Sequence, residues 1–402
     1  MKIPTWIWAV VGCFLLVPLK AENESLWQVH THNLHASYAP APMASGCIGI
    51  LPGKEPFRIE QVVLNHVFDA AAPGTVSRVM RGINPFGLNM KVDGETVDTT
   101  CIEGWNQTVD MRKAVHRTGF QIGRKAHVIS DLRALRGLPY SGLISVQVEA
   151  LTDITIEVRC GMEIPDDYGE STVYYRELDA DSTRLHLLEA KAVSARGAKQ
   201  VAAASAFLLE DETTSELSFE EATKELCLNV SIKKGETFSF SLVGSICSSR
   251  DFFDPYNEAE RQVVYAVHEG QEQLVGAHER LWNELWQSDI RIEGDDDAQR
   301  LVRFALFNLY SSCRAGSRLS IPPMGLSSQF YNGHIFWDTE LWMYPPLLLL
   351  QPELAKSMLD YRIDRIGPAR KKAMAYGYRG VMFPWAVSYT HLRAHETSQD
   401  LV

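Results

Sequence analysis

The stretch Gly333-His334-Ile335-Phe336-Trp337-Asp338-Thr339-Glu340 holds an aromatic pair, a histidine and two carboxylates in consecutive positions. An apolar run with helical spacing follows it directly. Aromatic faces pack against the C–H faces of sugar rings, and a neighbouring carboxylate can accept hydrogen bonds from two hydroxyls. The stretch therefore predicts part of a saccharide-binding wall at the start of a helix. The alternative for any single aromatic pair of this kind is ordinary core packing.

The sequence after this stretch contains further motifs in a fixed order, which favours the first interpretation over core packing. They are Tyr344-Pro345-Pro346, Pro352-Glu353-Leu354-Ala355, Tyr361-Arg362, Gly377-Tyr378-Arg379-Gly380 and Phe383-Pro384-Trp385. Taken together, this run resembles glycoside hydrolase family 65, which contains the maltose, trehalose and kojibiose phosphorylases and related hydrolases of α-glucosides. The resemblance is specific from Ile321 to Trp385, and looser but ordered from Asp289 back to Ser25.

The first half of the chain is predicted to be rich in β-strands. Ile154, Ile156 and Val158 alternate with polar residues, as in a half-buried strand, and residues 226–232 repeat the pattern. Asp93-Gly94 marks a hairpin. Many such strands indicate an antiparallel sandwich. The resemblance implies the same, an N-terminal super-β-sandwich, at residues 22–250.

Residues 251–294 change to helical spacing and correspond to the helical linker of the resembled family. One helix, or two broken near Gly270, is expected, with Trp282 and Trp286 packing it onto a domain. From 295 to 386 helix follows helix. An aspartate of Asp295-Asp296-Asp297 is expected to cap the first, rather than bind calcium. The apolar face of that helix is predicted to contain Leu301, Phe304, Ala305, Phe307 and Leu309.

Three more helices are expected at 338–350, 353–366 and 368–376. By resemblance, they are the truncated start of an α/α barrel built from six helical hairpins. Residues 387–402 have no counterpart in the family pattern and read as a non-homologous tail. His391, His395 and Glu396 lie in that tail, where no apolar periodicity would hold them as metal ligands. The resemblance places the general-acid glutamate beyond the point of departure, so the chain is expected to lack it and to be inactive.

Charge and leader sequence narrow the class of protein further. The net charge of −11 argues against nucleic acid and anionic membranes as partners. Lys2, the apolar run from Ile3 to Leu19, and Ala21 have the form of a secretory signal, which predicts a secreted or periplasmic protein without stable membrane insertion. The apolar run continues past Cys13, which disfavours a lipid anchor there. Six further cysteines lack a Cys-x-x-Cys pair and are expected to be buried small residues.

Candidate site residues are assigned by resemblance. Trp337 and Asp338 would line the subsite for the non-reducing glucosyl unit, and Phe336 is expected in the core. His334 would either reach the sugar or make a structural hydrogen bond. Arg379 would orient a carboxylate or form an ion pair, and Trp385 is a second-tier candidate. Glu340 is expected to support the helix start and to touch no sugar. The catalytic residues are unassigned, and no metal or cofactor is expected.

These observations favour an exported, inverting glycoside hydrolase of kojibiose-, trehalose- or maltose-like disaccharides. The first alternative is an inverting disaccharide phosphorylase that uses inorganic phosphate. Export weighs against it, because phosphorolysis conserves energy only where the sugar phosphate stays inside the cell. The second alternative is a non-catalytic carbohydrate-binding fragment. The partner is in each case a disaccharide or oligosaccharide, and a homodimer of the full-length enzyme stays open.

Overall fold

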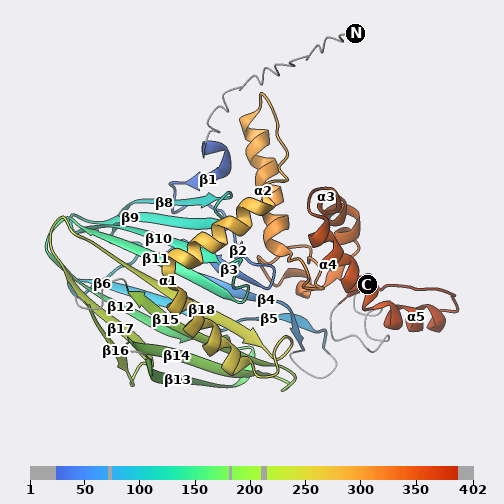
Figure 1. Ribbon diagram of the computed structural model, residues 1–402, viewed down its shortest axis with the longest axis horizontal. Helices are drawn as coiled ribbons and strands as arrows, with labels where there is room; N and C mark the ends of the chain where they lie inside the picture. Colours follow the sequence, from blue (N-terminus) through green and yellow to red (C-terminus); the bar gives the residue numbers. More distant parts are fainter. Residues whose placement is uncertain (1–23, 71–74, 181–182, 210–214, 388–402) are drawn as a thin grey trace, which may run out of the picture.

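The computed structural model describes residues 24–70, 75–180, 183–209 and 215–387. The predicted signal peptide and residues 388–402 of the predicted tail lie outside these ranges. A β-sandwich forms the N-terminal part, a long helix lies along it, and shorter helices make up the C-terminal end (Figure 1). The β-rich prediction for the first half and the helical prediction for the second are both confirmed.

The sandwich contains three antiparallel sheets. The largest has the order β1 (Gln28–Thr31), β8 (Ile102–Asp110), β9 (Val115–Ile122), β10 (Ala126–Ala134), β11 (Ser141–Ala150), β18 (Thr237–Ser248), β15 (Gln200–Leu209), β14 (Thr183–Ser194) and β13 (Tyr168–Ala180). The second has the order β16 (Ser215–Glu220), β17 (Glu225–Ile232), β12 (Ile154–Glu163), β6 (Asn84–Val92) and β7 (Glu95–Thr96). The third is β2 (Met43–Ala44), β3 (Ile48–Pro52), β4 (Ile59–Asp69) and β5 (Arg78–Arg81). A 3-10 turn, η1 (Glu24–Trp27), precedes β1.

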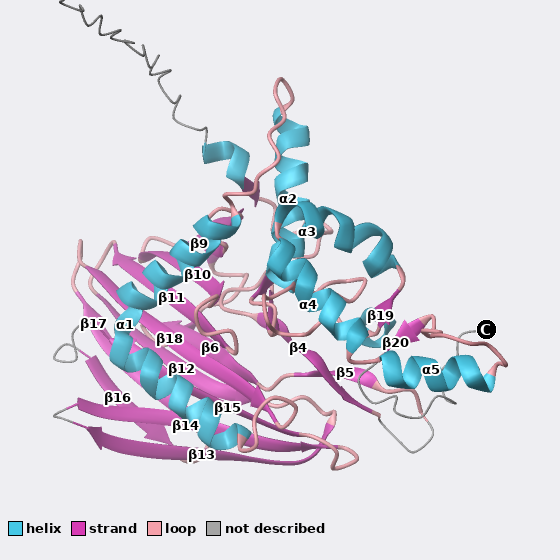
Figure 2. Ribbon diagram, turned by 45° about the vertical axis from the view of Figure 1, so that its right-hand side comes forward, coloured by secondary structure: helices cyan, strands magenta, loops and turns pink. Residues whose placement is uncertain are grey.

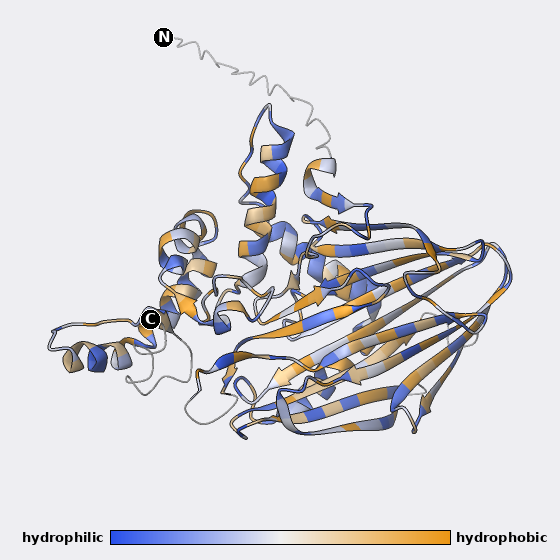
Figure 3. Cartoon of the chain, turned by 180° about the vertical axis from the view of Figure 1, so that it is seen from behind, coloured by the Kyte–Doolittle hydropathy of each residue, from blue (hydrophilic) through white to orange (hydrophobic). Residues whose placement is uncertain are grey.

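The sheets face each other through alternating apolar side chains, and Figure 3 shows this alternation along the strands. Phe86 of β6 packs directly against two glycines of the largest sheet. A Cβ atom added to Gly142 of β11 would lie 2.7 Å from the Phe86 ring, and one added to Gly244 of β18 would lie 2.8 Å from it. Gly142 and Gly244 are partners in the β11–β18 register. The fully buried Phe86 ring therefore sits over a pair of glycines that no larger residue could replace without displacing it.

Helix α1 (Pro255–Leu285) covers the opposite face of the largest sheet, as Figures 1 and 2 show. Its Val263, Ala266 and Leu274 pack against alanines of β15 and Val243 of β18. The helix breaks at Gly270, where φ is +79°. The predicted break is confirmed, and so is the packing of Trp282 and Trp286, which are buried.

Buried polar groups join the sandwich to the helices. The guanidinium of Arg136, in the loop after β10, donates to the carbonyls of Ser45, Tyr310 and Cys313 at 2.9–3.2 Å. The Arg136 backbone N–H donates to Nδ1 of His278 on α1, whose Nε2 lies 3.1 Å from the Lys113 carbonyl. This pattern requires a neutral imidazole protonated at Nε2. Burial agrees with it, because it lowers the pKa of His278 to about 4.

The C-terminal end is helical. Its elements are α2 (Asp296–Ser312), η3 (Phe330–Gly333), β19 (Ile335–Phe336), the π-helix η4 (Thr339–Met343), α3 (Tyr344–Leu350), α4 (Pro352–Ile363), α5 (Ile366–Ala375) and β20 (Ala386–Val387). The Asp295 side chain accepts a hydrogen bond from the Ala298 N–H and caps α2, as predicted. The helices α3 and α4 pack together, and α5 extends away from the sandwich (Figure 2).

The predicted apolar face of α2 is partly wrong. Leu301 is 69% exposed and Ala305 is also exposed, whereas Phe307 is fully buried. The buried side is centred instead on Arg303, Leu306 and Tyr310. The cause is an ion pair: Arg303 donates to the Asp289 carboxylate at 2.6 Å, with its side chain only 1% exposed. The charged Arg303 side chain can therefore be buried in the core, because the Asp289 carboxylate that pairs with it lies there.

Among the described residues, six cysteines are unpaired and all except Cys101 are buried, as expected. None of the helices in the described ranges combines the length and the apolar character that a membrane span requires.

Candidate functional site

Trp337 and Trp385, 48 positions apart in the sequence, meet at the edge of the helical end. The short strands β19 and β20 pair antiparallel, with Phe336 opposite Ala386, and this brings the two tryptophans together. Their ring centroids are 5.3 Å apart at 58°. They are 43% and 59% exposed, so their faces are open to a ligand. They border a pocket of about 420 Å³ whose lining is Trp337, Glu340, Arg362, Phe383, Pro384 and Trp385.

The residues directly before Trp337 are anchored on strand β5 and on Ser77, which precedes it. Gly333 has φ of +66°, and a Cβ there would come within 2.6 Å of Val79 on β5, so glycine is required. The next residue, His334, is buried, and its Nε2 lies 2.7 Å from the Ser77 carbonyl. Beyond Trp337, the buried Thr339 hydroxyl donates to the Ile321 carbonyl at 2.8 Å. These contacts fix the backbone on both sides of Trp337.

The residues after Trp337 begin as a π-helix, a form that often occurs at functional sites. The N–H groups of Glu340 and Leu341 both donate to the Trp337 carbonyl, at 3.1 and 3.2 Å. Trp337 and Glu340 are three positions apart and therefore share one side of the turn. Glu340 consequently lines the pocket with Trp337. The prediction placed Glu340 away from Asp338, which the spacing supports, but it did not anticipate Glu340 in the pocket wall.

Glu340 forms a forked ion pair with Arg362 of α4. The Arg362 Nε and Nη2 atoms donate to the two carboxylate oxygens at 2.7 and 2.8 Å. The Arg362 guanidinium also lies 5.2 Å from the centre of the Phe383 ring. The Arg362 side chain is 13% exposed and that of Glu340 is 37% exposed. A paired, partly open carboxylate of this kind keeps lone pairs that can accept hydrogen bonds from ligand hydroxyls.

Asp338 directly follows Trp337 but is not among the lining residues of the Trp337 pocket. It is the N-cap residue of the π-helix, half-buried, and makes no side-chain capping bond. Within the described ranges no hydrogen bond or ion pair engages its carboxylate, and it is not a lining residue of the Trp337 pocket.

The two remaining candidates lie outside the pocket lining. His334 is turned into the protein, where it contacts the Ser77 carbonyl and lies 5.6 Å from the Phe68 ring, which supports its structural alternative. Arg379 is exposed in the segment after α5, with no ion pair to another described residue. Phe336 is buried, in agreement with the expectation for it.

Sequence reasoning missed Arg362 and Phe383 as pocket residues. Both stand inside motifs that were recognised, Tyr361-Arg362 and Phe383-Pro384-Trp385, but nothing in a single sequence pairs them. The signal that was available is the spacing of Trp337 and Glu340, which places both on one helical side. The described residues contain no group of three or more metal-ligating side chains. An aromatic wall beside one neutralised carboxylate suits a neutral, hydroxyl-rich ligand.

Comparison with known proteins identifies the family. Residues 49–285 match the model of the glycosyl hydrolase family 65 N-terminal domain, and residues 303–401 match that of the family 65 central catalytic domain. The chain belongs to glycosyl hydrolase family 65. The second match extends through most of the segment 387–402, so the boundary of a non-homologous tail stays a prediction.

The relatives of this family 65 chain include two kojibiose hydrolases. That of Flavobacterium johnsoniae is 39% identical and that of Mucilaginibacter mallensis 37% identical, each over 87% of this chain and 52% of the relative. A solved structure assigned as a kojibiose phosphorylase, from the human microbiome, superimposes with a TM-score of 0.74 at 16% identity, over 91% of this chain and 52% of that one. The chain thus spans about half the length of the curated relatives it matches, and the solved structure supports the fold.

Proposed function

We propose that this chain is part of an inverting glycoside hydrolase of α-linked glucosides, with kojibiose as the first substrate to test. The single observation that carries the proposal is the pocket between Trp337 and Trp385, floored by the Glu340–Arg362 ion pair. The match to two kojibiose hydrolases over 87% of the chain supports this choice of substrate. Following the family resemblance, the helices from α2 onward would be the first part of an α/α barrel.

Each wall of the pocket has a distinct role in the proposal. Trp337 and Trp385 would pack on the C–H faces of the non-reducing glucosyl ring. The Asp338 carboxylate would accept hydrogen bonds from ring hydroxyls beside the pocket. Arg362 would fix the Glu340 carboxylate through two hydrogen bonds, and the remaining lone pairs of that carboxylate would accept hydrogen bonds from sugar hydroxyls. Because Arg362 contacts both of its carboxylate oxygens, Glu340 is assigned here as a binding residue and not as the general acid.

Turnover requires more than these residues supply. An inverting hydrolase uses two carboxyl groups roughly 6.5–9.5 Å apart, one as acid and one as base. Glu340 is the single carboxylate among the six described lining residues, and Arg362 engages it. We therefore expect no glucose release from kojibiose by the 402-residue chain on its own. Measurable release would overturn the assignment of Glu340.

The phosphorylase alternative has support of its own. A nigerose phosphorylase of Lachnoclostridium phytofermentans is 39% identical, although over only 38% of this chain. The proposed export of the protein, from the leader at residues 1–21, favours hydrolysis. Assays of the whole protein with kojibiose, in the presence and absence of inorganic phosphate, separate the two. Phosphate-independent release of two glucose molecules supports the hydrolase, whereas glucose 1-phosphate formed only with phosphate supports the phosphorylase.

Variants of the whole protein test the site itself. Trp337→Ala and Asp338→Ala should each lower kcat/KM for kojibiose by at least about tenfold, because each removes a direct sugar contact. Arg379→Gln, an exposed residue outside the lining, is the matched control and should stay within about twofold of wild type. If the control loses as much activity as the two site variants while circular dichroism is unchanged, the pocket is assigned wrongly.

A further inference from the structure

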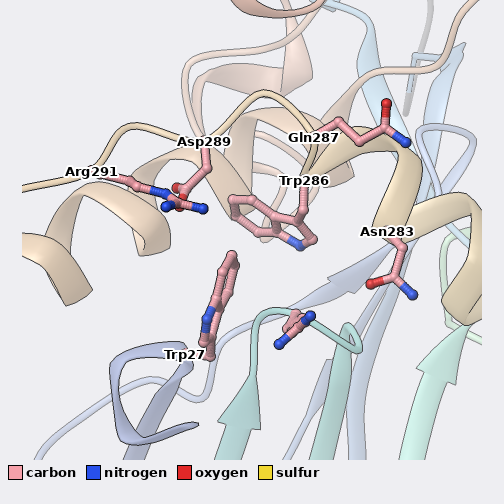
Figure 4. Close-up of a pocket in the computed structure, with 7 residues that line it drawn as sticks. Trp27, Asn283, Trp286, Gln287, Asp289 and Arg291 are labelled. Atoms are coloured by element: carbon pink, nitrogen blue, oxygen red, sulfur yellow. The ribbon is translucent and has the colours of Figure 1, made fainter. Parts of the chain in front are cut away.

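A second pocket lies at the junction of the sandwich and the linker helix, formed by elements that do not contribute to the Trp337 pocket (Figure 4). Its volume is about 260 Å³. The turn η1, the β8–β9 turn, the end of α1 and the segment after it surround it. Its lining is Trp27, Arg112, Asn283, Trp286, Gln287, Asp289 and Arg291.

The floor of this junction pocket is rigid. Trp27 and Trp286 meet edge to face, with ring centroids 4.9 Å apart. The Trp286 Nε1 group donates to the Met111 carbonyl at 2.9 Å, and the Met111 N–H donates to the Trp27 carbonyl at 2.9 Å. The guanidinium of the buried Arg303 lies 3.6 Å from the Trp27 ring centre. The β8–β9 turn, η1 and α1 are therefore held in one arrangement around the pocket.

The charges around the pocket are unbalanced. Among the described lining residues, Asp289 carries the one carboxylate. It accepts hydrogen bonds from Nη2 of Arg303 at 2.6 Å and from Nε of Arg303 at 3.2 Å. Arg112 and Arg291 are exposed, and neither is ion-paired to a described residue. The guanidinium of Arg112 lies 5.7 Å from the centre of the Trp27 ring. The lining thus presents two uncompensated guanidinium groups, in a chain whose net charge is −11.

Amide groups complete the set of donors. Asn283 lies in the last turn of α1 and Gln287 lies two residues beyond its end, and their side chains make no hydrogen bond within the described ranges. In Figure 4 the two amides lie on the same side of Trp286. Guanidinium forks and amide N–H groups together suit a tetrahedral oxyanion, which offers several acceptor oxygens at once.

Sugar stacking is a poor fit for this pocket. Trp27 and Trp286 are only 5% and 7% exposed, because each covers the other and Arg303 covers Trp27. Their faces are closed to a sugar ring, unlike those of Trp337 and Trp385. We propose that the junction pocket binds a phosphate group, either free or carried by a small sugar, through Arg112 and Arg291.

Calorimetric titration of the chain with inorganic phosphate, and separately with glucose 6-phosphate, in phosphate-free chloride buffer tests this. Both ligands should bind. Arg112→Gln and Arg291→Gln should each weaken binding by about tenfold or more, because each removes a charge-assisted contact. Arg124→Gln, in the exposed turn between β9 and β10, is the matched control and should change binding less than about twofold. Tighter binding of glucose 6-phosphate than of phosphate would assign the ligand as a sugar phosphate, and equal binding would assign it as free phosphate.

A phosphate site elsewhere in the protein must be distinguished from this one. Trp337→Ala should leave phosphate binding unchanged, and kojibiose should not compete with it. The proposal is overturned if neither ligand binds, or if binding survives in the double variant Arg112→Gln/Arg291→Gln. Either result leaves the proposed glucoside pocket untouched, since that pocket shares no residue with the junction pocket.

Discussion

The sandwich and the helical end bury their large hydrophobic side chains to different extents. Among the described residues, 22 large hydrophobic side chains are exposed, and 16 of them lie from Leu301 onward. In the sandwich, the largest sheet packs against the second sheet on one face and against helix α1 on the other. In the helical end, Leu349 and Met374 are 84% and 74% exposed. The sandwich therefore closes its own core, while the helices bury one side and present the other.

The two regions also differ in their roles: the closed sandwich supplies the support, and the open helical end carries the candidate site. The candidate site belongs to the more open region, where Trp337, Trp385 and Trp342 are exposed. Its precision comes from attachments to the closed region, such as His334 to Ser77 and Gly333 against Val79. A rigid scaffold that holds exposed aromatic residues is the arrangement that ligand binding requires.

The largest effect is expected from a change at the sandwich contact. Phe86→Ala leaves a cavity between the two larger sheets, over Gly142 and Gly244, and should lower the free energy of unfolding by about 3–5 kcal/mol. Urea unfolding followed by circular dichroism measures the change. A loss below about 1 kcal/mol would mean that the sheets do not depend on this contact.

A smaller effect is expected from the histidine between sandwich and linker. Burial lowers the pKa of His278 from 6.5 to about 4 in the folded chain. Between these values the unfolded chain binds a proton that the folded chain excludes, so the free energy of unfolding falls as pH drops from 6.5 to 4. The loss is on the order of 3 kcal/mol. His116, whose pKa burial also lowers to about 4, adds a contribution of the same sign.

Unfolding measured across this pH range checks the prediction. His278→Gln should flatten the slope in part, since His116 remains. His32→Gln, at an exposed position in the segment after β1, should keep the wild-type slope. Equal slopes in the wild type and in His278→Gln would show that this imidazole is not buried in neutral form.

The smallest effect is expected on the open side of α3. Leu349→Ala should change the stability of the helical end by less than about 0.5 kcal/mol, because the side chain is 84% exposed. Leu347→Ala, two residues away and fully buried, should cost about 2–5 kcal/mol. Thermal unfolding of the two variants compares them directly. Similar losses would mean that Leu349 is covered in solution and that the helical end is as closed as the sandwich.

Local patterns predicted much of the fold. Alternation located β12 and β17, Asp93-Gly94 located the β6–β7 turn, and Gly270 located the break in α1. These features depend on neighbouring residues only, so they can be read from one sequence. The exposed position of Leu301 could not be read from one sequence. It depends on the ion pair between Arg303 and Asp289, which lie 14 positions apart.

The site was predictable in its residue types but not in its pairing. Trp337 and Trp385 were both candidates, and the structure places them side by side. The Glu340–Arg362 ion pair was not foreseen, because it joins η4 to α4, and a single sequence carries no signal for such a contact. His334 shows the converse: its residue type suits sugar binding, but burial assigns it to the scaffold.

Amide hydrogen exchange followed by mass spectrometry tests the contrast between the two regions most directly. Peptides from β11, β15 and β18 should exchange last, by global unfolding, because their strands are buried between α1 and the second sheet. Peptides from residues 338–387 should exchange at least about a hundredfold faster, through local opening of helices that are packed on one side only. Equal protection of the two regions would contradict the account, because the helical end would then be as self-sufficient as the sandwich.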